Sequence, residues 1–175
     1  MIYVTSDLHG YPLDKLKDFL AKVGFGRDDE LYILGDVIDR GPDGVRILQW
    51  IMAQPNVKLL LGNHESMMLA CETALFDFES ENVSVPLGTR AEKLGLWLSN
   101  SGEVTFQALL AVRSREVEAI LRFLHRVTGI IRTRPKTAIF KSFRRFTLER
   151  RQPSCGLNPK NPIKISRFRV EDFLQ

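Results

Sequence analysis

The sequence LYILGDVIDRG, at residues 31–41, decides the fold. It opens with an apolar run rich in strand-forming side chains and turns polar at Gly35-Asp36, a pattern typical of a buried strand that ends in a loop. The apolar residues of the next segment, 45–52, recur at helical spacing. A strand followed by a helix is the first half of a βαβ unit.

The same pattern occurs on both sides of this stretch. Residues 2–5 (IYVT) form a strand-like run that stops at Ser6-Asp7, and a helical pattern follows over 13–23 with Gly24 as its C-terminal cap. Residues 57–61 (VKLLL) are a third run, which ends in GNHE at 62–65 and precedes a helix through 67–69. Parallel strands need crossover connections, so three strands separated by helices predict an α/β fold with a parallel sheet.

Polar side chains follow all three predicted strands. Ligands in parallel sheets bind beyond the carboxyl ends of the strands, so we expect these side chains to converge on one edge. Single Asp-Gly and Gly-Asn pairs are also common in turns and helix caps, and each cluster taken alone favours that plainer interpretation. The convergence of all three clusters favours a functional site. Its members are Asp7, His9, Asp36, Asp39, Arg40, Asn63 and His64.

Carboxylate, imidazole and amide donors suit Mn, Fe or Zn better than a soft metal. Asp36 belongs to the middle cluster and could bridge two ions that activate water and hold a phosphoryl group. Arg40 has the geometry to bind phosphate oxygens in a bidentate manner. His64 would then be the proton donor to the leaving group, with Asp39 fixing its orientation.

Three ordered motifs carry a family resemblance: DLHG at 7–10, GDVIDRG at 35–41 and GNHE at 62–65. They resemble the first three signatures of the calcineurin-like metallophosphoesterases, in the phosphoprotein phosphatase branch. That branch contains serine/threonine protein phosphatases and symmetrical dinucleoside tetraphosphatases. The stretch WLSNSG at 97–102 is similar to a pattern of small bacterial phosphatases, and this likeness extends to about residue 125.

The resemblance implies an α/β fold of the metallophosphoesterase type, a β-sandwich flanked by helices (αββα), here incomplete at the C-terminus. It implies a phosphoric monoester hydrolase that uses metal-activated water, with a phosphorylated protein or a small phosphoester as substrate. Mn is the expected metal, with Fe or Zn as alternatives, and the family holds two ions. The implied metal ligands are Asp7, His9, Asp36 and Asn63, while Arg40, Asn63 and His64 contact the phosphate and His64, Asp39 and Arg40 carry the catalysis.

The sequence departs from the family after the third motif. The family uses two more histidines for its second metal, and this chain has only three histidines in all. Ser154 stands where the resemblance places a His-Ala-Gly histidine, and no later Gly-His follows. We therefore expect a C-terminally altered and truncated relative, and an inactive remnant with a half metal site is an alternative to the enzyme. A reading-frame disruption over 126–155 would account for the change.

Charge separates the last 50 residues from the rest. Of the 25 basic residues 13 lie in 126–175, but only 3 of the 21 acidic ones do. We therefore predict a core at 1–125 and a divergent basic segment at 126–175. In that segment Arg144, Arg145, Arg150, Arg151, Arg167 and Arg169 alternate with Phe140, Phe143, Phe146 and Phe168.

Basic and aromatic side chains interleaved in this way allow a third interpretation, a tail that binds nucleic acid or an acidic partner. No order of residues typical of an RNA-binding motif is present, so we expect no nucleic-acid partner. We also expect no membrane partner, because no apolar run is long enough to span a bilayer. The N-terminus opens directly on the strand-like residues 1–4 with no basic n-region before them, so a cytoplasmic location is expected. Cys71 and Cys155 lie far apart with no metal-ligand spacing, so reduced thiols are expected.

Overall fold

A computed structural model describes residues 1–72, 87–127 and 165–168. Within these residues the sheet has four strands in the order β3-β2-β1-β4. β1 (Ile2–Thr5), β2 (Glu30–Ile33) and β3 (Val57–Leu59) are parallel, and β4 (Ser166–Phe168) runs antiparallel to β1. The α/β fold with a parallel three-stranded sheet, predicted from the sequence, is confirmed.

The register places the carboxyl ends of the three parallel strands side by side. Thr5 pairs with Ile33, and Ile33 pairs with Leu59. All four residues of β1 are buried, because the strand lies between β2 and β4. The loops after β1, β2 and β3 therefore leave the sheet at the same edge, as the sequence predicts.

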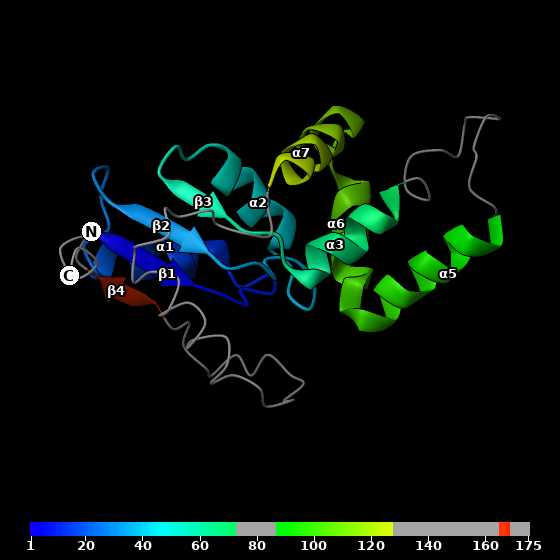
Figure 1. Cartoon of the computed structure of the whole chain (residues 1–175), viewed down its shortest axis with the longest axis horizontal. Helices are drawn as coiled ribbons and strands as arrows, with labels where there is room; N and C mark the ends of the chain where they lie inside the picture. The colour runs from blue at the N-terminus through cyan, green and yellow to red at the C-terminus, as the bar shows by residue number, and fades with distance from the viewer. Residues whose placement is uncertain (73–86, 128–164, 169–175) are drawn as a thin grey trace, which may run out of the picture.

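Helices connect the strands and continue beyond that edge. α1 (Leu13–Lys22) and α2 (Gly44–Met52) are the crossovers, and α3 (Asn63–Ala70) follows β3. The remaining helices are α5 (Leu87–Trp97), the π-helical turn η1 (Leu98–Gly102), α6 (Glu103–Ala111) and α7 (Ser114–Arg126). Figure 1 shows the strands at one end of the molecule and α3, α5 and α6 at the other.

Apolar side chains from the strands and from the helices form one core. α3 packs against α5 and α7, while α2 packs against α6 and α7. The inward residues of α7 recur three or four positions apart, which gives the helix one buried face: Val117, Ile120, Leu121 and Leu124. Within the ranges given above, every helix is too short or too polar to cross a bilayer.

The structure corrects one boundary and leaves other predictions untouched. The third helix begins at Asn63, earlier than the apolar residues 67–69 indicate, because polar residues form its first turn. Three predictions fall mostly or wholly outside the described residues: the second sheet of an αββα sandwich, the reading-frame disruption over 126–155, of which 128–155 are not described, and most of the basic tail. β4 is the strand among the described residues of segment 126–175, and it extends the sheet of the first segment.

Candidate active site

Backbone hydrogen bonds join the loop after β1 to the loop after β2. The N–H groups of Asp7, His9 and Gly10 donate to the carbonyl oxygens of Gly35, Asp36 and Val37, at 3.3, 2.8 and 2.7 Å. The N–H of Gly41 donates back to the His9 carbonyl at 3.0 Å. Side chains from two distant parts of the sequence are thus held at fixed positions relative to one another.

The two loops approach so closely that side chains would not fit at one point of contact. A Cβ atom built on Gly10 would collide with the backbone of Gly41, and one on Gly41 would collide with the backbone of Gly10. Gly10 also has a φ of 65°. Glycine is therefore required at both positions, and it allows the two loops to touch.

Strained backbone is concentrated in these loops. Among the described residues six non-glycine residues have a positive φ, and five of them lie in the two loops. Each such conformation costs about 1–2 kcal/mol, which the surrounding hydrogen bonds must offset. Strain held in place at convergent polar side chains favours a function for them. The five are Asp7, His9, Asp36, Asp39 and Arg40.

Asp7, His9 and Asp36 form a group that could hold a metal ion. Each offers one ligand atom, and these atoms all lie within 4.8 Å of one another. The Nδ1 atom of His9 lies 3.2 Å from the Ile38 carbonyl oxygen, to which it donates, so Nε2 is the nitrogen that could bind a metal. Burial, followed by the charge of Arg40, lowers the pKa of His9, which favours the neutral imidazole that a metal requires.

The contact between Asn63 and Asp36 also fits a cation. One heavy atom of the Asn63 amide lies 3.2 Å from both carboxylate oxygens of Asp36. With its nitrogen turned toward Asp36, the orientation that satisfies both groups, the amide donates two hydrogen bonds. With its oxygen turned toward Asp36, three acceptors would meet, and only a cation between them would satisfy that contact. Asp7, His9 and Asp36, with Asn63 beside them, therefore suit a divalent metal.

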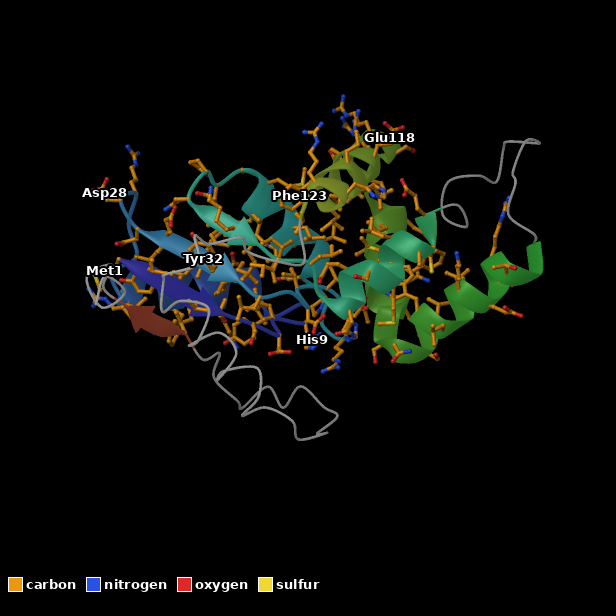
Figure 2. All side chains as sticks on the ribbon, in the orientation of Figure 1. Met1, His9, Asp28, Tyr32, Glu118 and Phe123 are labelled. Atoms are coloured by element: carbon orange, nitrogen blue, oxygen red, sulfur yellow. The ribbon has the colours of Figure 1, made fainter. Side chains whose placement is uncertain are left out.

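Asp39 and His64 form a buried pair beside this group. Asp39 is fully buried, and its Oδ2 lies 2.7 Å from Nδ1 of His64. The hydrogen bond to Asp39 is the main cause that raises the pKa of His64. The rings of His9 and His64 meet edge to face with their centroids 4.7 Å apart, so the pair borders the metal-ligand group directly. Figure 2 labels His9 where the loops of the sheet meet the helices.

Arg40 is exposed, as is Asn63 among the predicted set. Its N–H donates to the Ser101 carbonyl oxygen at 3.2 Å, which ties its backbone to η1. The side chain is left in solvent, close enough for its charge to lower the pKa values of His9 and His64. An exposed guanidinium beside the buried groups is placed to meet an anion that arrives from solution.

Glu65, the last residue of the third motif, is a further polar residue of the site, and no role is predicted for it from the sequence. It is fully buried, and its carboxylate accepts the N–H groups of Gly62, Asp36, Val37 and Ile38 at 2.9, 2.9, 2.7 and 3.2 Å. Burial raises the pKa of Glu65, while the backbone donors lower it. A Glu three residues after a helix-starting Gly is the capping-box spacing, a signal that could have identified it.

Trp97 and Thr105 also belong to the site, although the sequence does not predict them as site residues. Trp97 is fully buried, and its Nε1 donates to the two oxygens of Asp39 at 3.0 and 3.3 Å. The N–H of Asp39 donates to Oγ1 of Thr105 at 2.8 Å. A buried Trp usually needs a partner for its N–H, but the sequence alone does not say which acceptor it finds.

All seven predicted site residues thus meet at one edge of the sheet, while their individual roles stay predictions. His125 lies elsewhere: it is exposed on α7, with Nε2 2.6 Å from a carboxylate oxygen of Glu72. Cys71 is buried, and burial raises the pKa of its thiol. Ser154 and Cys155 lie outside the described residues. The same holds for Arg144, Arg145, Arg150, Arg151, Arg169, Phe140, Phe143 and Phe146, while Phe168 lies in β4 with an undescribed side chain.

Sequence comparisons relate the chain to known proteins. The model of the calcineurin-like phosphoesterase family matches residues 1–157. The symmetrical bis(5'-nucleosyl)-tetraphosphatase of Serratia proteamaculans is 33% identical over 100 residues, which are 55% of this chain and 35% of that protein. The protein of the same name from Aliivibrio fischeri is 32% identical over 116 residues, 64% of this chain and 40% of the relative.

The chain matches only a part of these relatives, between about a third and two fifths of their length. A solved metallophosphoesterase from Sphaerobacter thermophilus is 16% identical and covers 78% of this chain and 41% of its own, with a TM-score of 0.37. So low a TM-score leaves the assignment of the chain to the sequence matches.

Proposed function

This chain belongs to the calcineurin-like phosphoesterase family, and from that premise we propose that it hydrolyses phosphoric esters or anhydrides at the edge of its parallel sheet. The observation that carries the proposal is the contact between two groups. The metal-ligand group of Asp7, His9 and Asp36 borders the Asp39–His64 pair through the rings of His9 and His64. A site for a cation and a proton donor beside it are the parts that phosphoryl transfer to water needs.

A divalent metal site is typical of the family, and Asp7, His9 and Asp36 would hold the first ion. Asp36 and Asn63 would contribute to a second, since the Asn63 amide lies 3.2 Å from both carboxylate oxygens of Asp36. Such an ion supplies Lewis-acid activation of water and offsets the charge of the phosphoryl oxygens. We propose Mn, with Fe or Zn as alternatives, because carboxylate and imidazole donors accept all three.

The other residues act on the substrate. Arg40 binds phosphoryl oxygens with its exposed guanidinium, and Asn63 and His64 contact the same group. As water forms its bond to phosphorus and releases a proton to solvent, the bond from phosphorus to the leaving oxygen breaks. That oxygen takes the proton held on Nε2 of His64, because Asp39 occupies Nδ1 and leaves Nε2 as the ring nitrogen that can donate to the substrate.

Two classes of substrate are supported, and an experiment must decide between them. The names of the relatives support a dinucleoside tetraphosphate, in which the scissile bond is a phosphoanhydride. The motif resemblance also supports the monoester of a phosphorylated protein or small molecule. We place the dinucleoside tetraphosphate first, since the named relatives share more of the chain than the three motifs do.

The experiment compares the full chain with His64→Asn and His125→Asn on three substrates in the presence of Mn. The substrates are bis(5'-adenosyl) tetraphosphate, a phosphoserine peptide and 4-nitrophenyl phosphate. Loss of a general acid costs about 100-fold or more in turnover, so His64→Asn should lose that much while His125→Asn keeps wild-type rates. Equal activity of all three proteins would overturn the proposal, and the preferred substrate decides between anhydride and monoester.

One observation favours a second candidate, a remnant that binds a metal without turnover. Of the three histidines in the chain, His125 is paired with Glu72 away from the site, so no described histidine beyond His9 and His64 serves it. A second ion held by Asp36 and Asn63 alone would bind weakly. Metal content near one ion per chain by elemental analysis, with wild-type turnover no higher than that of His64→Asn, would favour the remnant.

A further inference from the structure

The hairpin formed by α5, η1 and α6 holds Asp39 by both its side chain and its backbone. Trp97, the last residue of α5, donates to the carboxylate through Nε1. Thr105, on α6, accepts the Asp39 N–H through Oγ1 at 2.8 Å. Trp97, Asp39 and Thr105 are each at most 2% exposed, so water does not compete for these hydrogen bonds.

Gly102 makes room for the indole. A Cβ atom at residue 102 would lie 2.6 Å from Nε1 of Trp97 and 2.7 Å from two further ring atoms. Phe106 packs edge to face against Trp97, with ring centroids 6.4 Å apart. The ring therefore has one position, and its N–H reaches Asp39 only because residue 102 has no side chain.

The same carboxylate oxygen serves both rings. Oδ2 of Asp39 lies 2.7 Å from Nδ1 of His64 and 3.0 Å from Nε1 of Trp97. Two donors on different elements fix the plane of the carboxylate, and that plane sets the direction of the His64 ring. Without the indole N–H, one oxygen of a fully buried carboxylate would lose its donor, and the group would reorient.

We propose that Trp97 is a positioning residue for His64, and that Gly102 and Thr105 support it. Trp97 holds the Asp39 carboxylate so that the His64 imidazole keeps Nε2 pointed at the leaving oxygen of a bound phosphoryl group. This rests on the proposed function only for the identity of the proton acceptor, since the hydrogen bonds themselves do not involve a substrate. It also gives a role to WLSNSG at 97–102, which the metal and phosphate contacts leave unexplained.

The first measurement needs no turnover. In the full chain with ¹⁵N-labelled histidine, the downfield proton on Nδ1 of His64 is assigned by its absence in His64→Asn. Trp97→Phe should shift this resonance and speed its exchange with water. Trp50→Phe, a change at the other tryptophan of the chain, should leave it unmoved. An unchanged resonance in Trp97→Phe would overturn the proposal.

A variant of the same shape covers the case in which Trp97→Phe does not fold. Benzothienylalanine at residue 97 has sulfur in place of the indole N–H, so it keeps the packing against Phe106 and removes only the donor. The same shift of the His64 resonance is expected. If this variant folds and the resonance stays at its wild-type position, Trp97 only fills space and the proposal fails.

Turnover gives the second readout. Proton donation matters most when the leaving oxygen is a poor leaving group, so Trp97→Phe should lose about 10-fold in kcat on phenyl phosphate and less than about 2-fold on 2,4-dinitrophenyl phosphate. KM should change little on either substrate. Equal losses on the two esters would overturn the proposal. A wild-type chain that hydrolyses neither ester would count against the proposed function, while the His64 resonance would still decide the role of Trp97.

Discussion

Two regions of the molecule position Asp39: the loops that follow β1, β2 and β3, and the hairpin formed by α5, η1 and α6. The sequence of the loops predicts a functional site, whereas the sequence of the hairpin does not. The loops carry side chains whose chemistry is visible by residue type, and they lie at the one sheet edge where ligands bind. The hairpin contributes a Trp, a Gly and a Thr, residue types that are ordinary in any core. What marks them is their contact with Asp39, and no sequence pattern states that contact.

The difference teaches that ligand residues and the residues that orient them are specified in different ways. A ligand must be of a certain chemical type, so Asp36 or His9 stands out in the sequence. An orienting residue needs only one donor or acceptor at the right distance, as Trp97 and Glu65 provide. Substitutions in the two regions can therefore separate loss of binding from loss of orientation.

The largest effect is expected for Asp36→Asn in the loop after β2. Loss of an outer partner of a metal ligand costs about 10–100-fold in affinity, so loss of this ligand should weaken Mn binding by about 100-fold or more. Titration of Mn followed by electron paramagnetic resonance measures the affinity. Asp14→Asn is the matched control, since Asp14 is an exposed carboxylate on α1. Binding of Asp36→Asn within a few fold of wild type would break the assignment of the loops as the ligand region.

Glu65→Gln should have the next largest effect, on folding. The new amide nitrogen would face N–H donors of the loop after β2, and leaving such buried donors unpaired costs about 1–3 kcal/mol. The free energy of unfolding from urea denaturation should fall by that amount. Glu92→Gln changes an exposed carboxylate on α5 and should stay within about 0.5 kcal/mol of wild type. Equal stability of the two variants would show that Glu65 does not hold the loop.

Thr105→Val tests the hairpin with a smaller change. The substitution keeps the shape of the side chain and removes the oxygen that accepts the Asp39 N–H. We expect a loss of about 1–2 kcal/mol in the free energy of unfolding, because one buried backbone donor is left unpaired. Thr105→Ser keeps the hydroxyl and should lie closer to wild type. A Val variant that is more stable than the Ser variant would mean that packing at Thr105 outweighs its hydrogen bond.

The fold and the set of site residues could be predicted where the physical signal is local. Strand-like runs ending in polar loops placed β1, β2 and β3 correctly, and the parallel arrangement put Asp7, Asp36 and Asn63 at one edge. The start of α3 could not be read this way, since its first turn is polar and is stabilised by a Glu65 side chain that also binds another loop.

Contacts between distant segments could not be predicted from the sequence, for a different reason. Trp97 is 58 residues from Asp39 and Thr105 is 66, and nothing in either segment encodes that pairing. The strand β4 likewise comes from the basic segment and pairs with β1. The proposed boundary near Arg126 therefore stays a proposal about composition, and limited proteolysis of the full chain is a direct way to test it.

The smallest effect is expected at Ser101, where the substitution should raise the free energy of unfolding instead of lowering it. Ser101 in η1 has a φ of 71°, a conformation that costs a residue with a Cβ about 1–2 kcal/mol. Ser101→Gly removes that cost and adds about 0.5–1 kcal/mol of chain entropy to the unfolded state, so a net gain of about 0.5 kcal/mol is expected. Urea denaturation measures the change.

Ser99→Gly is the matched control for this sign. Ser99 lies in the same turn with helical backbone angles, so glycine there relieves no strain and should cost about 0.5–1 kcal/mol. Opposite signs at the two serines would show that the hairpin carries strain that glycine removes at no cost to the site. In the loops glycine cannot be used to relieve the strain, because His9 and Asp39 have the same kind of backbone strain but must keep their side chains. A loss of stability in Ser101→Gly would mean that contacts of the serine side chain outweigh its strain.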